Sequence, residues 1–239
     1  MTEKELRQKV VSTAEAWLGT REYDAKHYEM LDIYNAQSPL PRGTRMQATW
    51  PWCAAFVSAV SLQCGLRDIM PTECGCPGMV RLYQEIGRWV EDDANTPSPG
   101  DVIFYDWQDN GVGDNVGQPD HVGIVTACDG QTMTIIEGNC DNAVKTRTLA
   151  VNARFIRGFG CPDYASKADG AEPTPEPTPA PTPTPEPEKP AEATVDPFIT
   201  KTAREVIAGK WGNGQARKDA LAAWFTKAVQ DEVNRILGG

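Results

Sequence analysis

The chain has 239 residues, enough for one medium-sized domain and a second small one. Its formal net charge of −10 argues against a protein that binds nucleic acid, because such binding needs a basic surface for the phosphates. No apolar run approaches the roughly 20 residues of a membrane span, so we expect no membrane insertion. The N-terminal residues MTEKELRQKVV have neither the apolar core nor the cleavage site of a signal peptide. We therefore expect a protein that is made and kept in the cytoplasm unless another route exports it.

The cysteine content gives no sign of a disulfide framework or a zinc site. Seven cysteines are present, and an odd number without a signal peptide argues against a set of structural disulfides. Cys74 and Cys76 form a C-x-C pair, which is tighter than the usual C-x2-C zinc knuckle, and the sequence has only two histidines. We expect no structural metal and no cofactor, and interpret most of the cysteines as small buried hydrophobic residues.

A proline-rich segment divides the chain. Residues 171–195 carry proline at nearly every second position, which predicts an extended polyproline II spacer of roughly 75 Å at about 3.1 Å per residue. It separates a first domain, residues 1–170, from a C-terminal module, residues 196–239. The module holds seven basic and five acidic residues, so its weak positive charge could favour an anionic polymer.

The first domain is expected to begin with helices. Thr2 to Glu5 read as a capping box, and an apolar stripe follows until Gly19 ends the first helix. Further helices are predicted over residues 53–62 and 79–90.

The remainder of the first domain is expected to be a sheet. After Pro99 and Gly100, short runs rich in β-branched and aromatic residues predict strands near 101–107, 121–127, 132–137, 143–149 and 153–159. Helices followed by an antiparallel sheet define an α+β fold. The C-terminal module reads as three short helices, over residues 199–208, 215–223 and 226–237.

Cys53 stands where a nucleophile is favoured. Thr49 can cap a helix, and proline is tolerated in a first helical turn, so Cys53 is expected at a helix N-terminus. The partial positive charge there favours thiolate over thiol, and the free backbone N–H groups can bind an oxyanion. The alternative on this segment alone is a buried cysteine that packs with Phe56 and Val57.

A cysteine nucleophile needs a base within hydrogen-bond reach, and the chain has two histidines. His27 lies in the polar helical stretch DAKHYEML and reads as a surface residue. His121 begins the predicted strand HVGIVTA after a loop, which is a good position to face a cleft. A structural histidine remains the alternative at this position.

A third polar group is expected on the neighbouring strand. Asp129-Gly130 predicts a hairpin, and the second strand ends with Glu137 and Asn139, which share a face. A two-residue turn would pair His121 with Gly138, whereas a three-residue loop or one bulge would pair His121 with Glu137. An acid or amide there could accept the Nδ1 proton of the imidazole. A solvated strand end is the alternative.

The order of these motifs resembles the CHAP family of cysteine, histidine-dependent amidohydrolases and peptidases. The resemblance covers roughly residues 10–164 and rests on WPWCAAFVSAV, PGDVIFYDW, DHVGIVTACDG and TIIEGN. It implies a papain-like α+β domain that hydrolyses amide bonds of peptidoglycan, either between muramic acid and L-alanine or within the peptides. It also implies Cys53 as nucleophile, His121 as general base and then acid, Glu137 as orienting group and Asn139 as a fourth polar member.

One departure from the family concerns calcium. Some phage members bind calcium through acidic residues just before the cysteine, but residues 41–52, PRGTRMQATWPW, contain no acid. We therefore expect no calcium there. The acidic stretch 106–115 lacks the spacing of an EF-hand loop and is interpreted as a loop that lines the cleft.

The C-terminal module resembles the CW-seven type of cell-wall-binding repeat. The similarity rests on AREVIAGKWGNGQARKDALAAW and AVQDEVNRIL and implies a three-helix module that recognises the muropeptide. Trp211 and Arg217 are the candidate ligand contacts, with the core of the bundle as the alternative place for Trp211. A single copy leaves no avidity from tandem repeats, and the oligomeric state is open.

Together these features predict a phage endolysin, which is made in the host cytoplasm and acts on the cell wall after release. The expected partner is bacterial peptidoglycan. Two alternatives stay open: an NlpC-type stem-peptide hydrolase or autolysin, and a catalytically silent protein that only binds the wall.

Overall fold

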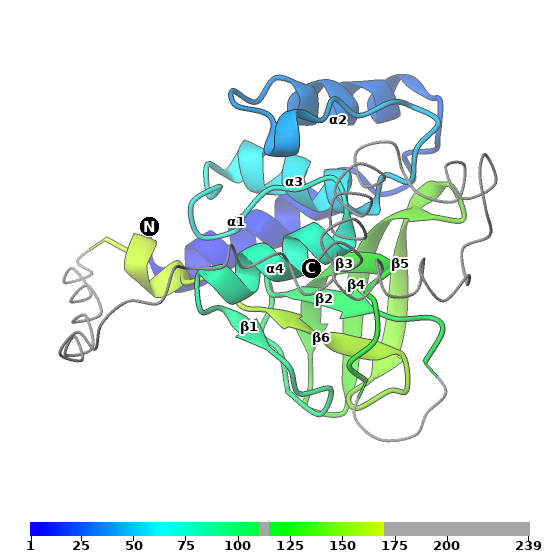
Figure 1. Cartoon of the computed structure of the whole chain (residues 1–239). Coiled ribbons are helices and arrows are strands. Elements are labelled where there is room, and N and C mark those ends of the chain that lie inside the picture. Colours follow the sequence, from blue (N-terminus) through cyan, green and yellow to red (C-terminus); the bar gives the residue numbers. More distant parts are fainter. Residues whose placement is uncertain (110–114, 170–239) are drawn as a thin grey trace, which may run out of the picture. The chain divides into compact units, whose positions relative to one another are not determined.

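The computed structural model describes residues 1–109 and 115–169. Within these ranges the helices come first along the chain and a single antiparallel sheet follows, as the α+β prediction requires (Figure 1). No helix of this part of the chain is long and apolar enough to cross a bilayer. The predicted linker, residues 171–195, and the predicted three-helix module, residues 196–239, lie outside the described residues.

The helices form where capping and apolar patterns place them. The first helix begins with a complete capping box, in which the Glu5 backbone N–H donates to Thr2 Oγ1 at 3.2 Å and the Thr2 N–H donates to Glu5 Oε2 at 2.7 Å. The α-helices are α1 (Glu3–Glu15), α2 (Ala25–Asn35), α3 (Cys53–Cys64) and α4 (Cys76–Glu85), and short 3₁₀ turns span Pro41–Gly43 and Tyr164–Lys167.

The prediction of a helix over residues 79–90 was wrong at both ends. Helix α4 begins at Cys76 and includes Pro77 in its first turn, where the missing N–H has no cost. It ends at Glu85, and Gly87, with a φ of 64°, takes the left-handed conformation that lets the chain leave the helix. Residues 89 and 90 then pair as a short strand.

The sheet has six strands within the described residues, and all its pairings are antiparallel. Their spatial order is β1-β6-β2-β3-β4-β5. The predicted strands are all present within a few residues, and β1 is additional. The bounds are β1 (Trp89–Val90), β2 (Val102–Tyr105), β3 (His121–Cys128), β4 (Thr132–Cys140), β5 (Ala143–Ala150) and β6 (Ile156–Gly160).

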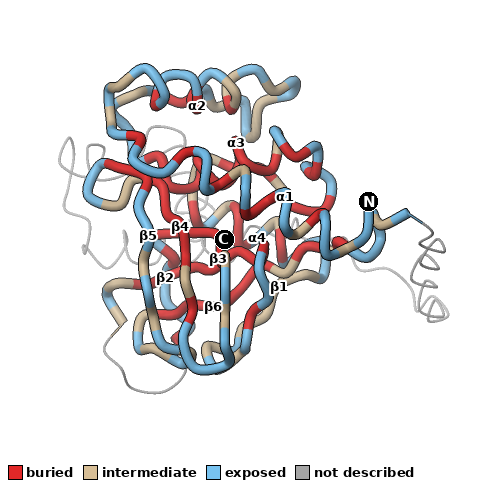
Figure 2. The backbone as a smooth tube through the Cα atoms, turned by 180° about the vertical axis from the view of Figure 1, so that it is seen from behind, coloured by how far each residue is buried: buried red, intermediate tan, exposed pale blue. Residues whose placement is uncertain are grey.

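The two faces of the sheet belong to two separate hydrophobic clusters. Along β2, Val102 and Phe104 join the larger cluster with the helices, whereas Ile103 and Tyr105 belong to a smaller cluster on the opposite face. Helix α3 packs on β3 and β4 and is buried at ten of its twelve positions, so its tube is almost wholly red in Figure 2. A helix that is apolar all round belongs in a core, and this one fixes the position of Cys53 at its first residue.

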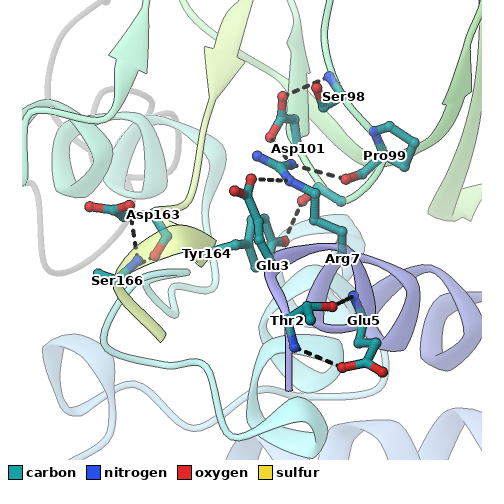
Figure 3. A network of polar contacts seen from close by, with 11 residues as sticks. Thr2, Glu3, Glu5, Arg7, Ser98, Pro99, Asp101, Asp163, Tyr164 and Ser166 are labelled. Carbon is teal, nitrogen blue, oxygen red and sulfur yellow. Dashed lines mark hydrogen bonds and ion pairs between the residues drawn. The ribbon is translucent and has the colours of Figure 1, made fainter. Parts of the chain in front are cut away.

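A polar network ties α1 to the start of β2. Arg7 Nη1 donates to Asp101 Oδ1 at 2.9 Å and to the Pro99 carbonyl at 3.0 Å, and the Tyr164 hydroxyl donates to the Gly100 carbonyl at 2.7 Å (Figure 3). The Arg7 guanidinium also lies over the Tyr164 ring, 4.5 Å from its centroid. The network joins the helical half of the domain to the sheet.

The β3–β4 hairpin contains the irregularity that decides the geometry of the site. Ala127 lies opposite Thr134, but Val125 lies opposite Ile135, so Thr126 is an extra residue of β3. The Thr126 hydroxyl donates to the Thr134 carbonyl at 3.1 Å and holds this bulge. Beyond it the register of the two strands is shifted by one residue.

Candidate active site

Cys53 is the first residue of α3, as the sequence predicts, but the cap is different. The N-cap residue is Trp52, which offers no side-chain hydrogen bond, so the prediction that Thr49 caps the helix was wrong. The backbone N–H groups of the first turn are therefore free of a capping side chain. The partial positive charge of the helix N-terminus favours the thiolate of Cys53, whose side chain is buried.

His121 is the first residue of β3, and its ring is held between a carboxylate and aromatic rings. Its Nε2 atom lies 3.2 Å from Glu137 Oε2. The imidazole stacks on Tyr105, with ring centroids 5.7 Å apart. We expected the orienting group at Nδ1, and that was wrong: the Glu137 carboxylate lies beside Nε2 and not beside Nδ1.

The bulge at Thr126 brings Glu137 to the same face of the sheet as His121. The prediction of an odd loop or a bulge is confirmed, but Glu137 lies opposite Gly123 and not opposite His121. Without the extra residue, the register near the turn would place Glu137 opposite Ile124, on the face that packs against the helices. With it, Glu137 and His121 are diagonal neighbours on one face.

Gly123 makes room for this diagonal contact. A Cβ atom at this position would lie 2.8 Å from Glu137 Cγ and 2.6 Å from Ile135 Cγ2. Such distances are too short for carbon atoms, so any larger residue would displace the carboxylate. The glycine lets Glu137 lie across β3 toward the imidazole.

Arg147 on β5 holds the other side of the carboxylate. Its Nε atom donates to Glu137 Oε1 at 2.7 Å, and its guanidinium lies 5.1 Å from the centroid of the Trp107 ring. Burial raises the pKa of Glu137, but hydrogen bonds from His121 and Arg147 outweigh it and lower the pKa to about 2. Although Glu137 is 0% exposed, its two cationic partners therefore keep it ionised.

The thiol and the imidazole shift each other toward the charged forms. A hydrogen bond from the thiol of Cys76 and the neighbouring His121 lower the pKa of Cys53 to about 5, against burial, which raises it. Burial lowers the pKa of His121, but hydrogen bonds with Cys53 and Glu137 prevail and raise it to about 9. At neutral pH the pair is therefore a thiolate and an imidazolium.

Asn139 is not brought into this chain of contacts. Its backbone has a φ of 58°, at the irregular end of the β4–β5 pairing, and no hydrogen bond joins its side chain to His121. A left-handed asparagine at a strand end turns the backbone away from the regular pleat. Its role therefore remains a prediction.

His27 is buried, and the prediction of a surface histidine was wrong. It lies on the inner side of α2, where its Nδ1 accepts the Tyr23 backbone N–H at 3.0 Å and its ring centroid is 4.8 Å from that of Trp52. Polar neighbours in DAKHYEML concealed this, because the inner side of the helix is defined by Met30, Leu31 and Tyr34. His27 supports the residue that precedes Cys53.

Several site residues escaped the sequence reasoning. Arg147 stands on a strand whose exposed positions alternate, so nothing distinguished it from a surface arginine. Cys76 lies 3.7 Å from Cys53, measured between the sulfur atoms, although it was interpreted as a small hydrophobic residue. The sequence did contain a hint: Gly75 and Pro77 on either side of Cys76 mark the start of a helix. Cys76 is therefore the first residue of its helix, as Cys53 is.

No group of three or more histidine, cysteine, aspartate or glutamate side chains in residues 1–109 and 115–169 is arranged to hold a metal ion. Residues 41–52 contain no carboxylate, so the oxygen ligands that calcium prefers are missing from that segment.

Comparison with known protein families identifies two parts of the chain. Residues 44–139 match the CHAP domain and residues 201–237 match the CW_7 repeat, so the chain carries both. A lysozyme of Streptococcus phage Cp-7 is 56% identical over 40 residues, which are 16% of this chain and 12% of that lysozyme. Comparison with solved structures gives no match.

Replacing Arg147 by methionine should raise the pKa of Glu137, because the buried carboxylate loses one of its two cationic partners. A depressed carboxylate pKa stabilises the fold above the unfolded value of about 4.5, and this stabilisation is lost as the pH falls toward about 2. In Arg147→Met the loss should be smaller and should end at a higher pH, because the folded pKa lies closer to the unfolded one. Urea unfolding as a function of pH measures this directly.

Arg147→Lys retains the charge and should lie between the wild type and Arg147→Met. Arg81→Met removes an exposed arginine that forms a long ion pair within one helix and serves as the surface control. If the unfolding free energies of the wild type and Arg147→Met depend on pH in the same way, Arg147 does not lower the pKa of Glu137.

Proposed function

We propose that this protein is a peptidoglycan hydrolase of the endolysin type, which cleaves an amide bond of the bacterial cell wall with Cys53 as nucleophile. The observation that carries the proposal is the grouping of Cys53, His121 and Glu137: the imidazole lies 3.2 Å from the Glu137 carboxylate, and His121 helps to lower the pKa of Cys53. The matches to the CHAP domain and the CW_7 repeat support a wall polymer as substrate, as does the similarity to a phage lysozyme.

In the first step the Cys53 thiolate attacks the carbonyl carbon of the scissile amide. Negative charge develops on the carbonyl oxygen, and the free backbone N–H groups in the first turn of α3 are suited to stabilise it. The His121 imidazolium then gives its proton to the leaving amine, the C–N bond breaks, and a thioester with Cys53 remains.

In the second step water hydrolyses the thioester. His121, now neutral, takes a proton from the attacking water and keeps it as imidazolium, while the C–S bond breaks and the carboxylic acid and the Cys53 thiolate separate. Glu137 accepts a hydrogen bond from Nε2 throughout, which fixes the ring and stabilises the imidazolium form. Arg147 keeps Glu137 ionised and in place. Asn139, two residues after Glu137 on β4, stays in the proposal as a fourth polar group of the site.

The products of wall digestion show which amide bond the enzyme cuts. An N-acetylmuramoyl-L-alanine amidase would leave muramic acid with a free lactyl carboxylate, whereas an endopeptidase would create new amines in the stem peptide or cross-bridge. Mass spectrometry of digested walls distinguishes the two.

The proposal predicts an unusual pH dependence for Cys53. Alkylation by iodoacetamide needs the thiolate, so it should rise through about pH 5, far below the value near 8.5 of an ordinary thiol. Wall lysis also needs protonated His121 and should fall again near pH 9. Both are measured on the full chain, the first by peptide mass spectrometry and the second by turbidity of purified walls.

Cys161 is an internal control for the alkylation, because burial raises its pKa to about 12. Cys53→Ser should abolish lysis and retain the fold. An alkylation midpoint near 8.5 would contradict an activated thiolate at Cys53, and a Cys53→Ser variant as lytic as the wild type would exclude Cys53 as the nucleophile. A wild type that binds purified walls without lysing them would point to a catalytically silent wall-binding protein.

The C-terminal module should supply wall affinity. We expect Trp211→Ala and Arg217→Ala to reduce pull-down of the full chain on purified peptidoglycan, because an aromatic face and a guanidinium are the groups best suited to bind the muropeptide. Hydrolysis of small soluble muropeptides should be nearly unchanged. Cys53→Ser is the reciprocal control, since it should bind walls normally without cutting them; unchanged pull-down of both module variants would contradict the assignment.

A further inference from the structure

A second thiol lies beside the proposed nucleophile. The sulfur atoms of Cys53 and Cys76 are 3.7 Å apart, both cysteines are reduced, and each is 5% exposed. They are the first residues of α3 and α4, and neither helix has a capping side chain. Two helix N-termini thus bring their first side chains to one point.

The distance between the two sulfurs is fixed by contacts between the segments that carry them. On α3, the Ser58 hydroxyl donates to the Glu73 carbonyl at 2.7 Å and accepts the Glu73 backbone N–H at 2.9 Å. The buried Glu73 carboxylate in turn accepts hydrogen bonds from Arg42 Nε at 2.8 Å and Nη2 at 2.7 Å. Glu73 stands just before α4, so these bonds hold the start of α4 against α3.

Gly78 completes this arrangement. A Cβ atom there would lie 2.7 Å from a carboxylate oxygen of Glu73, so the first turn of α4 approaches Glu73 more closely than a larger residue allows. The two thiols therefore face each other in a tightly packed part of the domain.

The two sulfurs differ in protonation. The hydrogen bond with Cys76 lowers the pKa of Cys53, and the same contact raises that of Cys76 well above its usual value. Cys76 is therefore the donor and Cys53 the acceptor. A thiolate with a second thiol 3.7 Å from its sulfur is the arrangement of a peroxide-sensitive pair.

We propose that Cys76 is a resolving thiol, which converts oxidation of Cys53 by a peroxide into a reversible Cys53–Cys76 disulfide. The Cys53 thiolate attacks one oxygen of hydrogen peroxide, the O–O bond breaks, and with one proton the products are Cys53 sulfenic acid and water. Cys76 then attacks the sulfenic sulfur, the S–OH bond breaks, and a second water leaves with the thiol proton. Two thiols have lost two electrons, and the peroxide has been reduced to two waters.

The consequence for activity rests on the proposed function. If Cys53 is the nucleophile, the disulfide stops hydrolysis, and a dithiol restores it by exchange. Without Cys76 the sulfenic acid is exposed to further peroxide and reaches the sulfinic acid, which a dithiol does not reduce. Cys76 thus protects the nucleophile as well as switching it off.

The test treats the full-length wild type, Cys76→Ser and Cys74→Ser with hydrogen peroxide and then with dithiothreitol. Non-reducing peptide mapping should find a Cys53–Cys76 cross-link in the wild type and in Cys74→Ser, the matched control two residues away. Lysis, normalised to each variant's own reduced activity, should be lost in all three and return with dithiothreitol in the wild type and Cys74→Ser. Cys76→Ser should stay inactive and carry sulfinic acid at Cys53.

Absence of the cross-link in the oxidised wild type would overturn the proposal, as would full recovery of Cys76→Ser. The wild-type mapping is decisive even if Cys76→Ser fails to fold. It also separates the two proposals, because the cross-link is detected without any activity. A lytic Cys53→Ser variant would remove the proposed function and leave the disulfide result standing.

Discussion

The buried carboxylate of Glu137 is the constraint on which the rest of the site depends. A fully buried charge is costly unless cationic partners and hydrogen bonds compensate for lost hydration. Glu137 has such partners on both oxygens, His121 on one and Arg147 on the other. Three strands contribute to this contact, so the central sheet must keep its register for the charge to be tolerated. The one-residue bulge at Thr126 sets that register.

The same carboxylate acts on the proposed nucleophile through the imidazole. Glu137 stabilises the protonated form of His121, and protonated His121 stabilises the thiolate of Cys53. Helix α3 adds the charge of its N-terminus, and its apolar surface, buried against the sheet, prevents Cys53 from moving away. Cys76 adds a hydrogen bond to the thiolate from a second helix N-terminus. The register of the sheet and the packing of the helices therefore both favour the ionised form of the Cys53 sulfur.

Local patterns in the sequence predicted much of this arrangement. The capping box of α1, the strands from 101 to 160 and the need for a bulge or odd loop all follow from short-range periodicity and turn chemistry. What escaped prediction depends on long-range packing. Arg147 looks like any exposed strand arginine until β5 lies beside β4, and Cys76 meets Cys53 only when the segment before α4 is bonded to α3. His27 was misjudged because its polar neighbours say nothing about the side of α2 that is covered. Glycine at 123 is explained only once the path of Glu137 is known.

The central claim, that His121 is held as an imidazolium between Cys53 and Glu137, can be measured by NMR titration of the imidazole nitrogens. The chain has only two histidines, so the assignment is direct. His121 should titrate near pH 9, with Nε2 protonated and hydrogen-bonded, and His27 should titrate below its usual value because burial lowers its pKa. In Cys53→Ser the His121 midpoint should fall, since the thiolate is gone. A His121 that titrates near 6.5 in the wild type, with no change in Cys53→Ser, would contradict the account.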